Sequence, residues 1–310
     1  MSFGISSKSQ LDFLLIELNG RMKKALITDL DNTLFDWVDV WYNSFSVMLS
    51  KVVEISGVDE ETLKDEIRQV HQKHGTSEYA FLLEELPSLQ TFCRGDDIRK
   101  VFEPAIDDFR MARRESLILY PSVSTTLNTL VSRNIKIVAF TESMAFYTNY
   151  RMRKLGLDDQ IDVLFSPEDH DLPKGLTAEN IRKYPAANYE LKRTVHKHTP
   201  KGQFKPNTEI LEAILADLKL NAEDCVYIGD SLHKDIAMAE DIGIDHAWAK
   251  YGVAQKRPEY ELLREVTHWS PEDVEREREA ANRNIEPAVV LETNFGELLD
   301  KFDFGVSKNG

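Results

Sequence analysis

The sequence predicts an α/β fold, a doubly wound parallel sheet of the Rossmann-like type with an inserted helical domain. Short apolar runs rich in β-formers alternate with helical patterns, which is typical of a parallel sheet covered by helices. Between the first two runs, residues 37–118 form a polar helical stretch that is too long for one crossover. The chain has 310 residues, 42% of them hydrophobic, which is enough to fill a sizeable core.

Six short runs with strand character are expected to form the sheet. They are, in order, KALITDL (24–30), IKIVAFT (135–141), IDVLF (161–165), CVYIG (225–229), IDHAWA (244–249) and AVVLE (288–292). In the inserted stretch, apolar residues recur at helical spacing in DEETLKDEIRQVHQK and DDIRKVFEPAIDDFRMARR. We therefore expect a helical domain at 37–118 and a discontinuous α/β core at 1–36 and 119–310.

The balance of charges excludes a general nucleic-acid binder. The formal net charge is −15, whereas proteins of that class use clustered Lys and Arg to neutralise phosphates. The two cysteines, Cys93 and Cys225, have neither the spacing of zinc ligands nor that of a disulfide framework. A reducing, cytoplasmic location is the simplest expectation.

The N-terminal apolar run at 11–18 carries Asp12 and Glu17 and lacks a cationic start. We interpret it as a peripheral amphipathic helix and not as a signal peptide, with Met22 as a possible alternative start. No later run reaches the roughly eighteen apolar residues that a membrane span requires, so no membrane association is expected.

Two carboxylates end the first predicted strand, in ALITDLDNTLF. Asp29 and Asp31 stand two residues apart, and Thr33 follows at the same spacing. They are expected at the carboxyl edge of the sheet, where ligands bind in open α/β folds. One carboxylate there can bind a metal and attack phosphorus while the other transfers a proton. For an isolated pattern of this kind, an acidic turn that only caps the next helix is an equally good interpretation.

Three later segments, in order, favour the chemical interpretation. Thr141 ends IKIVAFT with a hydroxyl that can bind a phosphate oxygen, although alone it is more often a helix cap. Lys205 opens the helical pattern FKPNTEILEAIL, where an anion can be bound, although a lone Lys is usually a solvated charge. Asp230 and Asp235, in VYIGDSLHKDIAMAEDIG, follow a glycine turn and suit a hard cation such as magnesium.

This ordered set resembles the haloacid dehalogenase-like (HAD) superfamily over roughly residues 24–300. The first motif matches as DLDNT, the second as Thr141, the third as Lys205 and the fourth as GDSLHKD. The stretch 37–118 is similar to the helical cap of the branch whose cap lies between the first and second motifs. Such a cap closes over a small substrate and excludes water.

The resemblance implies a magnesium-dependent phosphatase that hydrolyses a small phosphorylated metabolite through an aspartyl-phosphate. Asp29 is the expected nucleophile and Asp31 the expected general acid and base. Family members that cleave carbon–halogen bonds are not expected to carry an acidic residue at the position of Asp31. The expected magnesium ligands are Asp29, Asp230 and the backbone carbonyl of Asp31, with Asp235 orienting the metal shell. The expected phosphate contacts are Thr141, Lys205 and the backbone amide near Glu142.

Two alternatives remain open at this point. A phosphotransferase or a sugar-phosphate mutase uses the same nucleophile but passes the phosphoryl group to a substrate hydroxyl. A binding or regulatory module keeps the fold without turnover. The sequence also leaves open the oligomeric state and the identity of the phosphate ester.

Two insertions have no assigned role. The first, 167–204, lengthens the connection to Lys205, so that Lys197 and Lys201 are possible substitutes for it. Its basic residues Lys192, Arg193 and Lys197 could contact a second anionic group of the substrate, although a solvated loop is the simpler interpretation. The second, 252–286, includes the charged segment SPEDVEREREAANR, which we interpret as a solvated helix.

Overall fold

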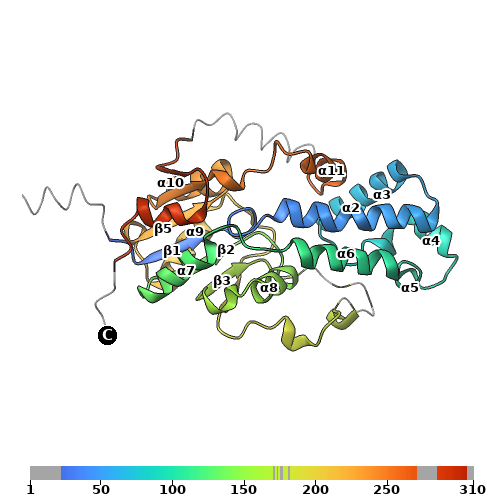
Figure 1. Ribbon diagram of the computed structural model, residues 1–310, viewed down its shortest axis with the longest axis horizontal. Helices are drawn as coiled ribbons and strands as arrows, with labels where there is room; N and C mark the ends of the chain where they lie inside the picture. Colours follow the sequence, from blue (N-terminus) through green and yellow to red (C-terminus); the bar gives the residue numbers. More distant parts are fainter. Residues whose placement is uncertain are drawn as a thin grey trace, which may run out of the picture.

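A computed structural model describes residues 22–169, 172, 174, 177–180, 182–270 and 285–305. Its central element is a seven-stranded sheet in the order β4-β3-β2-β1-β5-β6-β7, with helices on both faces (Figure 1). Every neighbouring pair is parallel, which confirms the predicted fold class. The strands are β1 (Ala25–Thr28), β2 (Lys136–Phe140), β3 (Val163–Ser166), β4 (Val195–His198), β5 (Cys225–Gly229), β6 (Asp245–Ala249) and β7 (Val289–Leu291).

Six of these strands lie in the six predicted runs, and β4 is an addition. It lies inside the insertion 167–204, which the sequence analysis interpreted as a loop. The sequence VHKH has no apolar run because β4 is an edge strand that pairs only with β3. Val195 is 53% exposed, so the usual burial signal of a strand is absent.

Alternation along the central strands divides the core into two layers. Leu26 of β1 faces a cluster with α7 (Val123–Ser132), α8 (Ala145–Lys154) and α13 (Leu298–Lys301). Ile27, its neighbour, faces the opposite cluster with α9 (Thr208–Leu218) and α10 (Ala237–Asp241). Because successive side chains of a strand point to opposite faces, four buried residues in a row serve both layers.

The insertion after β1 forms a separate helical lobe, which lies beside the sheet in Figure 1. This cap lobe has its own buried cluster, which includes Phe45, Leu63 and Phe102. Asp36 begins its first helix by accepting a hydrogen bond from the Asp39 amide, and Gly57 ends it at a φ of 66°. The helices are α2 (Trp37–Ser56), α3 (Glu60–His74), α4 (Pro87–Cys93), α5 (Ile98–Val101) and α6 (Glu103–Ser116).

The two connections between the sheet and the cap lobe run side by side. Phe35 and Leu119 form an antiparallel bridge, and the Tyr120 amide donates a hydrogen bond to the Leu34 carbonyl at 2.9 Å. These contacts lie next to the predicted boundaries at 36/37 and 118/119. The chain therefore leaves the sheet and returns to it at one place.

The second insertion also reaches the cap lobe. Helix α11 (Glu259–Val266) contributes Tyr260, Leu263 and Val266 to the buried cluster of the cap, although its sequence was assigned to the core. His71 of α3 places Nδ1 2.6 Å from the Val266 carbonyl oxygen. The rest of the predicted solvated helix beyond Ser270, and the predicted helix at 11–18, lie outside the described residues.

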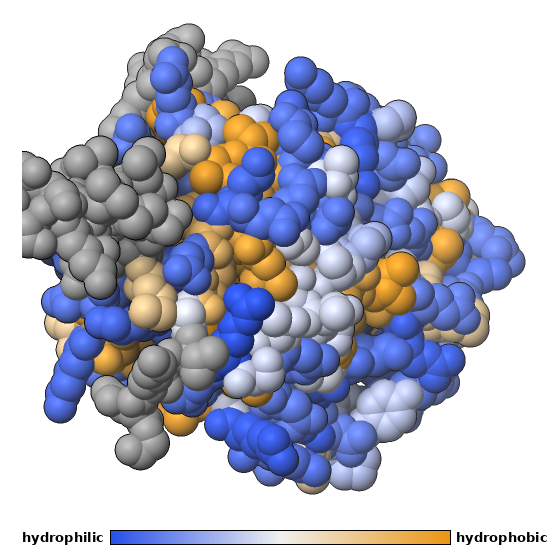
Figure 2. Space-filling view, turned by 60° about the vertical axis from the view of Figure 1, so that its left-hand side comes forward, coloured by the Kyte–Doolittle hydropathy of each residue, from blue (hydrophilic) through white to orange (hydrophobic). Residues whose placement is uncertain are grey.

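The face shown in Figure 2 is mostly hydrophilic, with separate hydrophobic patches between the polar side chains. This distribution agrees with the strongly charged composition. Among the described residues, no helix combines the length and the apolar character that a bilayer-spanning segment needs.

Candidate active site

The predicted site residues follow the three central strands at one edge of the sheet. Asp29 follows β1, Thr141 follows β2 and Asp230 follows β5. In the sheet register, Ala25 of β1 lies opposite both Lys136 of β2 and Cys225 of β5, so the three strands end close to one level. The parallel direction of the strands therefore gathers polar side chains at the carboxyl edge.

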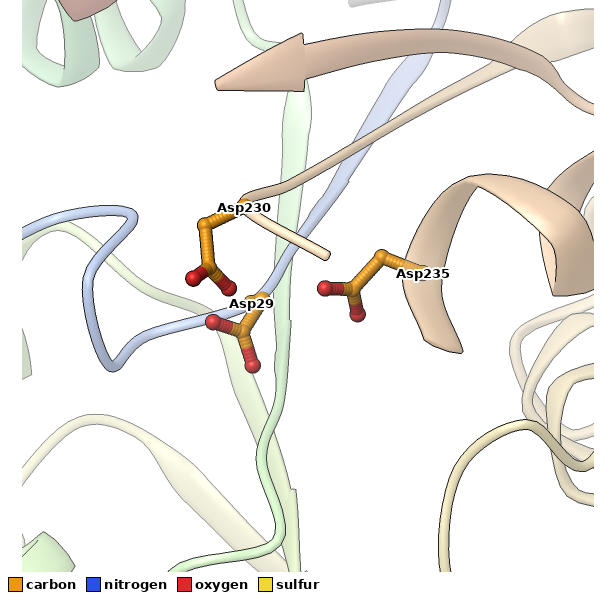
Figure 3. Close-up of side chains that lie close together, drawn as sticks. All are labelled: Asp29, Asp230 and Asp235. Carbon is orange, nitrogen blue, oxygen red and sulfur yellow. The ribbon is translucent and has the colours of Figure 1, made fainter. Parts of the chain in front are cut away.

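Three carboxylates converge at this edge. One oxygen from each of Asp29, Asp230 and Asp235 lies within 4.8 Å of the other two, and Figure 3 shows the three groups turned toward one region. Gly229 makes this approach possible, because a Cβ atom there would lie 2.3 Å from the Asp235 Cγ. The close packing of Asp235 thus explains why a glycine stands at the start of GDSLHKD.

Lys205 joins two of these carboxylates. Its Nζ lies 2.7 Å from Asp29 Oδ1 and 2.9 Å from Asp235 Oδ1. The ammonium is buried and also lies 4.7 Å from the centre of the Phe140 ring. Lys197 is bound instead to Asp217 on α9, so it does not replace Lys205 in this structure.

Hydrogen-bond donors reach Asp235 but not the Asp230 carboxylate. Asp235 accepts bonds from Lys205, from the Tyr227 hydroxyl at 2.9 Å and from the Ser231 amide at 3.2 Å. Within the described part of the chain, no group donates to the side chain of Asp230. Asp235 is therefore fixed in place, whereas Asp230 keeps its oxygens free for a ligand.

The electrostatics of the three carboxylates favour a bound cation. The pKa of Asp29 is raised to about 7, mainly by burial, which Lys205 opposes and the charges of Asp235 and Asp31 reinforce. Burial also raises the pKa of Asp230 well above its usual range, and the charge of Asp29 adds to this. Close, buried carboxylates resist ionising together unless a positive ion lies among them.

The residues present fit a divalent metal. Carboxylate oxygens are the hard donors that magnesium and calcium prefer, and three of them face one region. Asp230 has unbonded oxygens, and Asp29 offers a second oxygen besides the one held by Lys205. The backbone carbonyl of Asp31 as a third ligand stays a prediction.

Asp31 lies beside the cluster in a separate network. Its Oδ2 accepts bonds from the Thr141 hydroxyl at 3.0 Å and the Ser143 hydroxyl at 2.7 Å. Its Oδ1 lies 3.4 Å from Nη1 of Arg151. The Thr141 hydroxyl, which was expected to bind phosphate, thus donates a hydrogen bond to Asp31 in this structure. These contacts hold the Asp31 carboxyl in one orientation.

Sequence analysis did not identify Ser143, Arg151 or Glu78. Arg151 lies on α8 with a side chain that is only 2% exposed, and its second terminal nitrogen donates to Glu78 of the cap lobe. In the sequence, YRMRK reads as the basic last turn of a surface helix, so nothing signalled a buried cation. Ser143 could have been found from its place two residues after Thr141.

Glu142 connects two basic residues near the site. Its Oε1 accepts a bond from the Lys205 amide at 2.8 Å, and its Oε2 accepts one from Lys234 Nζ at 2.7 Å. The carboxylate therefore supports the segment that carries Lys205. The predicted contact between phosphate and the backbone near Glu142 stays a prediction.

The basic residues of the first insertion lie elsewhere. The amides of Lys192 and Arg193 donate to Asp158, before β4 and thus at the amino edge of the sheet. Lys197, within β4, bonds Asp217. The hypothesis that Lys192 and Arg193 contact the substrate is wrong for this structure, because Asp29 lies at the opposite edge.

Comparison with protein-family models gives two matches. Residues 23–243 match a model described as haloacid dehalogenase-like hydrolase. Residues 204–291 match a model described as HAD-hydrolase-like. The first match includes the segments that carry Asp29, Thr141, Lys205 and Asp230. No curated protein sequence matches the chain significantly.

Solved structures are similar to the chain at low sequence identity. A 2-haloacid dehalogenase from Pseudomonas syringae pv. Tomato DC3000 is 18% identical with a TM-score of 0.50, covering 90% of this chain and 97% of its own. A protein described as a predicted phosphoglycolate phosphatase from Haemophilus somnus 129pt is 14% identical with a TM-score of 0.46, over 90% and 97%. A Thermotoga maritima protein, provisionally described as a β-phosphoglucomutase, is 17% identical with a TM-score of 0.47, over the same shares.

Proposed function

Because the chain belongs to the haloacid dehalogenase-like hydrolase family, we propose that it is a magnesium-dependent phosphatase acting on a small phosphate monoester. The supporting observation is the position of Asp31, two residues after Asp29 and held by Thr141 and Ser143. An ester oxygen that leaves phosphorus needs a proton, whereas a leaving halide does not. A second, oriented carboxyl group beside the nucleophile therefore favours ester hydrolysis over dehalogenation.

In the first step, a carboxylate oxygen of Asp29 attacks phosphorus and the bond to the ester oxygen breaks. Asp31 gives its proton to the departing alkoxide, so the alcohol leaves neutral and an aspartyl-phosphate remains on Asp29. Lys205, bound to Asp29 and Asp235, keeps the nucleophile in place and supplies positive charge near the phosphoryl oxygens.

In the second step, Asp31 accepts a proton from water, and the water oxygen attacks the phosphorus of the aspartyl-phosphate. The acyl phosphate bond breaks, which releases inorganic phosphate and restores the Asp29 carboxylate. Asp29 and Asp230, with the Asp31 carbonyl as a further proposed ligand, would hold magnesium, which would supply charge that offsets the phosphate anion. Asp235 supports this arrangement through Lys205 and Tyr227.

The test is a panel of phosphate monoesters assayed for phosphate release with magnesium, together with 2-haloacids assayed for halide release. We expect magnesium-dependent phosphate release, its loss in Asp29→Asn, and its reversible loss with EDTA. Halide release without phosphate release would assign dehalogenation instead. Phosphorylated products from added acceptor alcohols would indicate a phosphotransferase or mutase, and no turnover of any compound would indicate a binding module.

A further inference from the structure

A cavity of about 90 Å³ lies between the cap lobe and helix α8. Its apolar wall is formed by side chains from α2, α6 and α8, namely Trp41, Phe45, Met48, Phe109, Phe146 and Tyr147. This volume has room for several water molecules or for one compact organic group. Aromatic walls of this kind favour a flat or apolar occupant.

The cavity is connected to the proposed general acid by two side chains. Glu78, which lines the cavity, accepts a hydrogen bond from Arg151, and Arg151 contacts Asp31. The Tyr147 ring, also in the wall, has its centre 5.9 Å from the Arg151 guanidinium carbon. The cavity therefore begins beyond Arg151, one side chain away from Asp31.

Most charges around the cavity are balanced by partners. Glu78 is engaged by Arg151, and Glu84 is engaged by Arg99. Arg110 pairs with Asp107 at 3.3 Å. The same Asp107 oxygen also receives Lys183 at 2.8 Å, so these ion pairs are close to balanced in charge.

Arg113 lies in the cavity wall and has no acidic partner among the residues that the structure describes. Its guanidinium carbon lies 5.2 Å from the centre of the Phe109 ring, 5.1 Å from Tyr147 and 4.8 Å from Tyr150. Its buried Nε has no hydrogen-bond partner, and no carboxylate of the described residues forms an ion pair with it. A buried donor on a cation carries a free-energy cost that an anionic ligand removes.

The tyrosines beside Arg113 do not neutralise it. Burial raises the pKa of Tyr147, and Arg113, which also hydrogen-bonds the Tyr147 side chain, lowers it only in part. Burial likewise raises the pKa of Tyr150. Both rings therefore carry neutral hydroxyl groups at neutral pH, and the positive charge of Arg113 remains available.

We propose that this cavity receives the leaving group of the substrate and that Arg113 binds a carboxylate at its far end. The inference rests on the proposed phosphatase function and names its substrate class. That class is a phosphate monoester whose leaving group has a compact, flat or apolar body and ends in a carboxylate. The guanidinium carbons of Arg113 and Arg151 lie 5.1 Å and 5.9 Å from the centre of the same Tyr147 ring, so one compact body can reach both cations.

The test compares 4-carboxyphenyl phosphate with 4-carbamoylphenyl phosphate, which have the same shape but differ in charge. We expect kcat/KM to favour the carboxylate ester by at least about tenfold, as for a charge-assisted hydrogen bond in a partly buried site. In Arg113→Gln the ratio of the two kcat/KM values falls to near one. Arg114→Gln, an exposed neighbour on the same helix, keeps the native ratio.

The inference and the proposed function fail in different ways. Equal kcat/KM for the two esters in the native protein overturns the inference while the phosphatase function stands. If neither ester is hydrolysed, calorimetry with 4-carboxybenzylphosphonate and its carbamoyl analogue makes the same comparison without turnover. Tighter binding of the carboxylate, lost in Arg113→Gln, supports the carboxylate site, and equal binding overturns it.

Discussion

The ammonium of Lys205 lies 2.7 Å from Oδ1 of Asp29, a residue 176 positions earlier in the chain. The same ammonium contacts Asp235, so one buried cation joins the segments after β1 and β5 to the segment before α9. Asp29 is thereby held at the sheet edge with one oxygen engaged. Its other oxygen accepts a bond from the neutral Thr33 hydroxyl at 3.1 Å.

The first prediction concerns this cation. Lys205→Met should destabilise the protein by about 3 kcal/mol, because Asp29 and Asp235 lose their buried partner. Phosphatase activity should fall by at least about 100-fold, since charge near the phosphoryl group is lost. Urea unfolding in metal-free buffer and steady-state assays measure the two effects. Lys197→Met and Lys201→Met serve as controls, and a comparable loss of activity in either would move the role away from Lys205.

The second prediction separates Asp31 from Asp29. Asp31→Asn should slow the first step on an alkyl phosphate by about 100-fold or more, because the alkoxide then leaves without a proton. On 4-nitrophenyl phosphate the loss should be about tenfold or less, since that phenolate leaves readily. Magnesium binding should persist, because only the backbone carbonyl of Asp31 is a proposed ligand. Rapid-mixing kinetics measure the rate of the first step for both esters. An equal loss of that rate on both would show that Asp31 is not the general acid.

The third prediction concerns Asp230, whose carboxylate accepts no hydrogen bond from the described residues. Asp230→Asn should raise the Tm of the metal-free protein, because the variant no longer buries a carboxylate beside Asp29 and Asp235. The same change should weaken magnesium binding by at least about tenfold, so the rise in Tm on adding magnesium should nearly vanish. Thermal unfolding with and without magnesium gives both results. The exposed Asp300→Asn is the matched control, and an unchanged response to magnesium in Asp230→Asn would contradict the site.

The fourth prediction uses the contact between α3 and α11. Burial lowers the pKa of His71 from 6.5 to about 4, and its Nδ1 faces the Val266 carbonyl. Below pH 6.5 the unfolded chain binds a proton at this residue that the folded protein does not, so stability falls as the pH drops toward 4. The loss from His71 should reach about 2 kcal/mol at pH 5.

Urea unfolding of the native protein and His71→Gln between pH 7 and pH 4.5 measures this effect. The variant should be less stable at pH 7 but should lose less stability on acidification. His198→Gln, at an exposed position on β4, should show the same change of stability with pH as the native protein. Identical slopes for the native protein and His71→Gln would show that His71 does not cause the acid sensitivity.

Local sequence patterns were sufficient to predict the strands that are buried on both faces. The runs at β1, β2, β3 and β5 are short and apolar because each lies between two layers of the fold, whereas β6 and the edge strand β7 keep apolar runs although they are less buried. The edge strand β4 has one neighbour and exposed positions, so its sequence VHKH carries no such pattern. The docking of α11 on the cap lobe was also missed, since an amphipathic helix does not specify which apolar surface it covers.

The sequence by itself determined the fold class, the family and the positions of Asp29, Asp31, Thr141 and Asp230 at strand ends. It could do so because strand direction and motif spacing are local properties of the chain. Only the tertiary structure decided that Lys205 reaches Asp29, that Arg151 joins Asp31 to Glu78, and that Arg113 lines the cavity without an acidic partner in the described part of the chain. Those facts depend on which distant segments pack together, and a charged side chain on a helix reads the same whether its partner is water or a buried carboxylate.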